Sequence, residues 1–493
     1  MKRRASKSRP SAATPPPPPP PRGNEPGPDA AASPVGKPAG SGPPTPPRSW
    51  LNQAALGALL GLAVAKFGNP ALLDRYTTAP GSFYEYLFFA WPLRWGYGAL
   101  FLATLVCLFR ARWRPEAPRW LLALPAVWFG WQLLAASGTV DAALTRVTLP
   151  YLGSVALCYY VGLAALGGER EGRVFWLCYL VGFGFMLATG FEQHFGGLAA
   201  ARDQILARPD RDLLPPEYLE RVNKMRVFAT LLYPNALAGV LLLMLPAVSV
   251  GAWRLLGFLT PPSRVLLGGA LAAAGLACLY WSKSKAGWLV ALLMGTVLFW
   301  RLPFARRWKI GFSTLLLVAG LAAFFVRFAD YFERGATSVG ARFDYWRAAA
   351  QTVRDHPVLG AGPGAFAREY RQRKTPEAEM ARLAHNDYLQ QACDSGLPGA
   401  FAYAAFVWGG LGLLARRCWR DPLHFAMWLG LLGWGLQSAA EFGLYIPPIG
   451  WAAFLMFGWL SGLPNPPPRR AAGSPGPAES SENGGQVTPA PAA

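Results

Sequence analysis

Apolar runs dominate this chain and follow one another with little polar sequence between them. Residues 50–463 contain about twelve apolar spans of roughly 18–25 residues, a length that crosses a bilayer as a helix. The second span is interrupted by Pro92 and Arg94. The pattern predicts an all-α polytopic membrane protein with about twelve transmembrane helices. The spans begin near Leu51, Tyr84, Trp120, Val147, Val174, Phe228, Val265, Ala286, Ile310, Gly399, Leu423 and Tyr445.

Three polar stretches surround or interrupt this transmembrane domain at 50–463. Residues 1–49 include the run Pro15–Pro21 and cannot bury a core, so we predict a disordered Pro-rich cytoplasmic tail. Residues 464–493 have a similar composition and are predicted to be a second disordered tail. Residues 328–397 separate the ninth span from the tenth, and we expect them to form a large helical loop.

Basic residues sort the loops into two sets. With the N-terminus inside, every predicted inner loop is short and basic-rich, as the positive-inside rule demands. The same register places the 328–397 loop outside. The formal net charge of +20 comes from these loops and the tails, so we expect membrane lipids and no nucleic acid as partners. The inner loops are Arg110–Arg119, Gly167–Arg173, the stretch near Arg254 and Arg264, Arg301–Lys309, and Arg416–Arg420.

The cysteines and histidines form no metal-binding pattern. The six cysteines are scattered singly without a CxxC spacing, and the four histidines show neither HxxxH nor HExxH. We therefore expect neither a metal nor another cofactor.

Two sites place cations beside apolar spans at the outer surface. Arg226 precedes the sixth span, in which Pro234 and Asn235 would break the helix and line a cavity. Lys283 and Lys285 stand between two spans with almost no loop, where an anion such as a diphosphate would be a natural partner. The alternative for both sites is that the side chains snorkel to lipid headgroups.

The 328–397 loop carries the remaining candidates. Arg342 and Trp346 share one helix face, and His356-Pro357 ends that helix. The cluster Gly360-Ala-Gly-Pro-Gly364 is a tight turn whose backbone N–H groups could face an anion.

A second helix is predicted to start near Arg382 and to carry His385, Asn386 and Gln390, with the last two on adjacent turns of one face. Histidine titrates near neutral pH, so His385 could take a proton from an attacking hydroxyl. The alternative is a structural histidine that packs and hydrogen-bonds.

Together these segments resemble the O-antigen ligase and O-antigen polymerase superfamily of bacterial membrane proteins, over roughly residues 220–462. The pattern R-x3-W…HPxxGxGPGxF…HNDYLQ…SGxxG carries the resemblance. Upstream, Arg226 with Pro234-Asn235-Ala-Leu-Ala238 resembles the family's Arg and PNxLA. Ser284-Lys285-Ala-Gly287 resembles its SRGG segment, with lysine in place of arginine. The matching loop residues are Arg342, Trp346, His356, Pro357, Gly360, Gly362, Phe366, His385–Gln390, Gly396 and Gly399.

The resemblance implies a glycosyltransferase that needs no metal. Such an enzyme takes an oligosaccharide from undecaprenyl diphosphate and passes it to a hydroxyl of lipid A-core, a glycan or a protein, at the periplasmic face of the bacterial inner membrane. We expect Arg226, Lys285 and Arg342 to bind the diphosphate and His385 to ready the acceptor, inverting the anomeric carbon. The supporting residues would be Asn386, Gln390, His356 and Gly362.

Several functions stay open at this point. A polysaccharide polymerase and a protein O-oligosaccharyltransferase would use the same machinery and differ only in the acceptor. A transporter of lipid-linked sugar would place charges within the spans and show inverted repeats. Here the charges gather at span ends and in one outer loop.

Overall fold

The structure is a computed structural model that describes residues 50–109, 116–209, 219, 222–329, 337–376 and 378–464. All regular elements in these ranges are helices, which confirms the all-α prediction. The predicted disordered tails, residues 1–49 and 465–493, lie outside the described residues, as do 110–115 of the first inner loop and 330–336 of the long loop.

An apolar helix lies at each of the twelve predicted spans. Six helical stretches in the described ranges are long and apolar enough to cross a membrane: Ala142–Leu166, Arg173–Leu206, Pro234–Phe258, Pro261–Trp281, Arg306–Arg327 and Asp387–Cys418. The chain is therefore a multi-pass membrane protein, and the total of twelve spans stays a prediction. The helices are α1 (Trp50–Lys66), α3 (Leu93–Leu108), α4 (Arg119–Ala136), α5 (Ala142–Leu166), α6 (Arg173–Glu192), α9 (Pro234–Leu255), α10 (Pro261–Trp281), α11 (Lys285–Arg301), α12 (Arg306–Arg327), α16 (Asp387–Ala404) continued by η5 (Ala405–Gly409) and α17 (Gly410–Cys418), α18 (Pro422–Gln437) and α19 (Pro447–Ser461).

Prolines decide where several helices begin. The helices α9, α10, α18 and α19 have proline in their first turn, where its missing N–H is not needed. Pro92 precedes α3 and divides the second predicted span, so its first part forms only the short helix α2 (Phe83–Phe88). Pro234 starts α9, so the sixth span begins six residues later than Phe228, and the residues before it are irregular.

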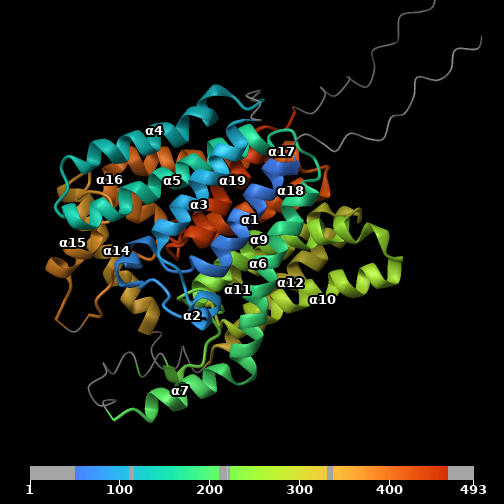
Figure 1. Cartoon of the computed structure of the whole chain (residues 1–493), viewed down its shortest axis with the longest axis horizontal. Helices are drawn as coiled ribbons and strands as arrows, with labels where there is room; N and C mark the ends of the chain where they lie inside the picture. Colours follow the sequence, from blue (N-terminus) through green and yellow to red (C-terminus); the bar gives the residue numbers. More distant parts are fainter. Residues whose placement is uncertain are drawn as a thin grey trace, which may run out of the picture. The chain divides into compact units, whose positions relative to one another are not determined.

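Glycines bring the central helices into backbone contact. The helix α1 carries Gly57 and Gly61, a GxxxG spacing, against α6. A Cβ on Gly182 of α6 would lie 1.9 Å from the carbonyl oxygen of Gly61. The pair α5 and α19 repeats the arrangement, since a Cβ on Gly458 would lie 2.0 Å from the carbonyl oxygen of Tyr159. Figure 1 shows α19 within the bundle, and every residue of that helix is buried.

The helices α10 and α12 are packed much less tightly. Most of their side chains are exposed, among them Leu266, Val318 and Phe325. Figure 1 shows the two helices together at one side of the bundle. Apolar exposure of this kind is expected where a helix faces lipid tails.

The predicted inner loops contact one another. Arg254 donates to the carbonyl of Arg170 (2.9 Å), and Arg301 donates to that of Trp419 (3.0 Å). Arg417 donates to the carbonyl of Glu116 (2.9 Å). Each guanidinium therefore bonds a backbone carbonyl that lies outside the helices and has no intrahelical donor.

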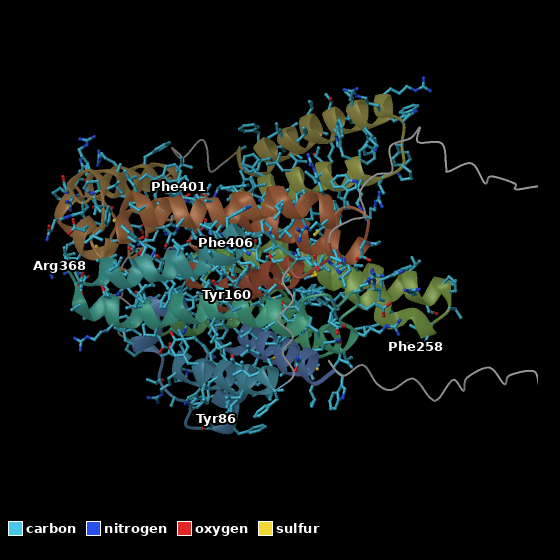
Figure 2. All side chains as sticks on the ribbon, turned by 90° about the horizontal axis from the view of Figure 1, so that it is seen from above. Tyr86, Tyr160, Phe258, Arg368, Phe401 and Phe406 are labelled. Atoms are coloured by element: carbon cyan, nitrogen blue, oxygen red, sulfur yellow. The ribbon has the colours of Figure 1, made fainter. Side chains whose placement is uncertain are left out.

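The predicted outer loops meet in the same way. The N–H of Val140 donates to the carbonyl of Ala361 (2.9 Å). Figure 2 shows Arg368, from the long loop, at the opposite end from Phe258, which lies between α9 and α10. One residue of the long loop and one residue of a predicted inner connection therefore lie at opposite ends, and the sidedness of the loops stays a prediction.

We expect Gly182→Ala to lower the thermal stability of the purified protein by several degrees, because the new methyl group would collide with α1 backbone. Gly184→Ala is the matched control on the same helix, since a Cβ there meets nothing within 4 Å. Alanine favours a helix over glycine by about 1 kcal/mol, so the control should be neutral or stabilising. Equal melting temperatures for both variants would contradict the close contact.

Single cysteines at Phe258 and Arg368 test the predicted sidedness. In intact spheroplasts an impermeant maleimide should label Arg368→Cys and not Phe258→Cys, because a charged reagent does not cross the bilayer. Both should be labelled after permeabilisation. Labelling of Phe258→Cys in intact cells would reverse the topology.

Candidate functional site

The described part of the long loop is built from two helices and an aromatic cluster. The helix α14 (Thr337–Asp355) ends before His356-Pro357, as predicted. The helix α15 (Phe366–Arg373) places Tyr370 edge-on to Tyr345 of α14, with ring centroids 5.2 Å apart. These rings form a small hydrophobic core that is separate from the main one.

The glycine-rich turn does not offer its backbone to an anion. Ala361 N–H donates to the carbonyl of Cys393 (2.8 Å), and Gly362 N–H donates to that of Asp394 (3.0 Å). Both carbonyls are available because α16 breaks at Gly396, which has a φ of +70°. The expectation for the turn was therefore wrong, since the break in α16 supplies acceptors for its N–H groups.

The helix that follows begins later than predicted. The α16 helix starts at Asp387, with Asn386 as its N-cap, whose side chain accepts a first-turn N–H at 3.0 Å. Gln390 accepts the backbone N–H of Ala384 at 2.8 Å. Asn386 and Gln390 therefore hold the backbone around His385 rather than forming a shared helix face, which corrects the prediction.

A buried polar network supports this helix from behind. Tyr445 donates to the carboxylate of Asp394 (2.5 Å), and Gln391 donates to the hydroxyl of Tyr445 (2.7 Å). The Gln391 carbonyl oxygen accepts from Trp128 (2.7 Å) and Gln132 (2.8 Å) of α4. The network fixes α16 against the segment that follows α18.

One cavity of about 1100 Å³ brings together four of the predicted residues. Arg226, Lys285, Arg342 and His385 all line it. They come from four separate segments of the sequence, so the fold rather than the local pattern assembles them.

None of the four predicted supporting residues lines this cavity: Asn386 and Gln390 hold the backbone beside it, and the other two lie elsewhere. His356 is exposed and follows the end of α14. Gly362 packs closely against α4–α5, since a Cβ there would lie 2.1 Å from Thr139 Oγ1. The structure gives Gly362 a packing role and gives His356 no contact with the other candidates.

Arg226 is fixed by two hydrogen bonds. Its Nε donates to the carbonyl of Ser282 (2.9 Å), and its Nη2 donates to Asn235 Oδ1 (2.7 Å). Asn235 is the second residue of α9, so the break at Pro234 places its amide toward the guanidinium. This geometry replaces the snorkelling alternative, because the side chain is held within the protein.

Positive charge is concentrated around the cavity. Burial lowers the pKa of Arg226. The charge of Arg342 lowers this pKa further, and the charge of Glu441 raises it. Burial also lowers the pKa of Lys283, helped by Arg327 and Arg226. Crowded cations of this kind would be stabilised by an anion. The cationic residues lining the cavity are Arg202, Lys224, Arg226, Lys283, Lys285, Arg342 and Arg382.

Glu441 is the residue that the sequence analysis missed. Its buried carboxylate forms an ion pair with Arg342 and accepts from Asn235 Nδ2 at 2.6 Å. The same carboxylate lies 3.4 Å from His385 Nδ1. Its signal in the sequence was a lone carboxylate beside apolar spans, 56 residues beyond His385, which is typical of an intramembrane functional residue.

The imidazole of His385 is held between two aromatic rings. Tyr345 stacks on it with centroids 5.6 Å apart, and Phe442 meets it edge-on at 4.7 Å. Glu441 contacts Nδ1, and Nε2 makes no hydrogen bond within the described part of the chain. A carboxylate on one ring nitrogen fixes the orientation and the tautomer of the ring, which leaves the other nitrogen as the acceptor.

Backbone strain gathers at the same place. The described residues include four non-glycine residues with positive φ: Met225, Ala229, Lys283 and His385, at +46° to +52°. Three of them line the cavity. Each such conformation costs on the order of 1–3 kcal/mol and is typical of functional sites.

Comparison with known proteins identifies the segment that carries part of this site. Residues 270–404 match a family model described as O-antigen ligase, which confirms the predicted resemblance. The segment includes Lys285, Arg342 and His385, while Arg226 and Glu441 lie outside it. An uncharacterized protein of Haemophilus influenzae is 26% identical over 150 residues, which cover 26% of this chain and 37% of the relative. The match therefore spans little more than a third of that relative.

We expect Glu441→Gln to bind inorganic pyrophosphate more tightly, roughly tenfold or 1.4 kcal/mol, because a carboxylate that repels the anion is removed. Isothermal titration calorimetry on protein in nanodiscs would measure it. Glu379→Gln is the control. This carboxylate lines the same cavity but is exposed, so its removal should change pyrophosphate binding little. Unchanged or weaker pyrophosphate binding by Glu441→Gln would contradict the charge balance inferred for the site.

Proposed function

We infer that this chain, which belongs to the O-antigen ligase family, transfers an oligosaccharide from an undecaprenyl-diphosphate donor to an acceptor hydroxyl. Membership of the family, together with the apolar helices, indicates a membrane glycosyltransferase of the ligase or polymerase kind. The observation that carries the proposal is the cavity shared by Arg226, Lys285, Arg342 and His385. We place the reaction at the periplasmic face of the inner membrane.

The cationic residues that line the cavity, which we call the cationic wall, stabilise the leaving group. As the bond between the anomeric carbon and the phosphate oxygen breaks, negative charge grows on the diphosphate. Fixed donors aimed at developing charge are a large source of catalysis. Arg226 is prepositioned by Ser282 and Asn235, and Lys285 stands at the N-terminus of α11, whose dipole adds positive potential.

The incoming group is handled by His385. With its Nδ1–H directed to Glu441, the imidazole would accept the acceptor's hydroxyl proton at Nε2. The hydroxyl oxygen then attacks the anomeric carbon from the side opposite the diphosphate, which departs with the bonding electron pair. A single displacement of this kind inverts the anomeric carbon. Glu441 stabilises the imidazolium that results.

Arg342 interacts both with Glu441 and, in the proposed reaction, with the diphosphate. Its ion pair with Glu441 holds both charges at a place where an unpaired buried charge would be costly. A diphosphate that contacts Arg342 would weaken this pair and leave more of the carboxylate's charge for His385, which its other oxygen already contacts. Donor binding and proton acceptance are therefore coupled through one carboxylate.

We expect His385→Ala to reduce glycan transfer by about 10²–10⁴-fold, because proton transfer by a positioned side chain contributes that much. Binding of the lipid-linked donor should be unchanged. Transfer would be measured with purified protein, an undecaprenyl-diphosphate-linked oligosaccharide and candidate lipid, glycan or protein acceptors. His356→Ala is the matched control and should retain wild-type activity.

Arg226→Ala should weaken donor binding by roughly 10–100-fold, since a hydrogen bond to a charged group contributes about 1.5–3 kcal/mol. Wild-type transfer by His385→Ala, or unchanged donor binding by Arg226→Ala, would remove the role given to that residue. Translocation of the donor without covalent transfer would favour a carrier instead.

A further inference from the structure

A cluster of two arginines and a tyrosine lies at the rim of the cavity, and the proposed reaction gives none of the three a role of its own. The guanidinium carbons of Arg75 and Arg382 lie 4.8 and 5.1 Å from the centroid of the Tyr76 ring. Both arginines also donate to the Tyr76 hydroxyl, at 2.8 and 3.1 Å. The two arginines are 307 positions apart in sequence numbering (382 − 75), so this cluster is a product of the tertiary fold.

The cluster is positively charged and exposed. All three residues are exposed, and Tyr76 is 60% accessible. Among the described residues, the ion pairs include none with Arg75 or Arg382. The neighbouring carboxylate of Asp74 instead accepts the N–H of Leu93 at 2.7 Å.

Arg75 and Arg382 each donate one N–H to the Tyr76 hydroxyl, so most N–H donors of the two guanidinium groups are not used in this cluster. Each guanidinium has five N–H donors in a planar fork, and the fork matches the oxygens of a phosphate or a carboxylate. Holding two like charges at one ring is unfavourable, and an anion between them would offset the repulsion. The geometry therefore resembles a receptor for an anionic group.

The position of the cluster indicates what would carry the anion. Arg382 lines the large cavity, and Tyr76 lines a neighbouring depression of about 350 Å³. Arg382 is three residues before His385, so their Cα atoms are at most about 11 Å apart. A ligand that presents a hydroxyl to His385 can therefore reach the cluster with a nearby group. The exposed ring adds an apolar surface beside the charges.

We propose that Arg75, Tyr76 and Arg382 form a subsite for a phosphate or carboxylate group on the sugar chain that enters the cavity. The carbohydrate nature of this ligand rests on the proposed function, whereas the anion preference rests on the cluster itself. Phospholipid headgroups carry the same chemistry, so the experiment must separate the two sources.

Binding of a phosphorylated maltooligosaccharide, compared with the same oligosaccharide after phosphatase treatment, tests the subsite. The protein would carry His385→Ala and sit in nanodiscs of zwitterionic lipid without donor, so that the readout does not require transfer. We expect Arg75→Gln and Arg382→Gln each to weaken binding of the phosphorylated form roughly tenfold. Binding of the dephosphorylated form should stay the same.

Two further variants sharpen the result. Tyr76→Phe keeps the ring and removes the hydroxyl that aligns both guanidinium groups, so a smaller loss confined to the phosphorylated form is expected. Arg368→Gln is the control, because Arg368 is an exposed arginine of the same loop that does not line the cavity, and it should have no effect.

Three outcomes would overturn the subsite. Equal losses for both oligosaccharides would indicate a general change in the cavity, and no loss for either would remove the anion site. A loss that appears only as reduced binding of phosphatidylglycerol, when that lipid is added to the nanodiscs, would assign the cluster to headgroups. If the wild type fails to transfer glycan while the selective loss persists, the subsite stands and the proposed reaction falls.

Discussion

The buried carboxylate of Glu441 is the interaction on which the site depends. Cationic side chains from four segments converge on one cavity, and without a compensating anion they would repel one another in a poorly solvated place. Glu441 pairs with Arg342, accepts from Asn235 and contacts His385, and Asn235 in turn aligns Arg226. One negative charge thus joins the two halves of the chemistry, the half that binds an anion and the half that accepts a proton.

The parts of this arrangement that are local in sequence were predictable. The apolar spans, the basic inner loops and the end of α14 at His356-Pro357 each follow from a pattern within a few residues. The choice of Arg226, Lys285, Arg342 and His385 came from spacing and resemblance, and the structure places all four at one cavity. The sequence could not predict their geometry, because the four residues are separated by up to 159 positions (385 − 226) and only the tertiary fold brings them together.

The predictions that were wrong or incomplete have a common physical cause. In each case a hydrogen bond or ion pair with a partner outside the local pattern determines the structure. The glycine-rich turn looked available to a ligand, yet its N–H groups bond to carbonyls released by the break at Gly396. The helix near Arg382 began late because Asn386 satisfies the first turn and leaves His385 in a left-handed conformation. Glu441 belongs to no motif, and its one sequence signal, a lone carboxylate beside apolar spans, did not identify the partners that the fold gives it.

The loose packing of α10 and α12 has a consequence for the environment in which the protein works. Lys283 belongs to the turn between α10 and α11, Lys285 begins α11, and α12 lies against α11 with its outer face exposed. Lateral pressure from acyl chains would act directly on these helices and through them on the cationic wall. The spacing of the cations should therefore depend on the thickness and fluidity of the surrounding lipid.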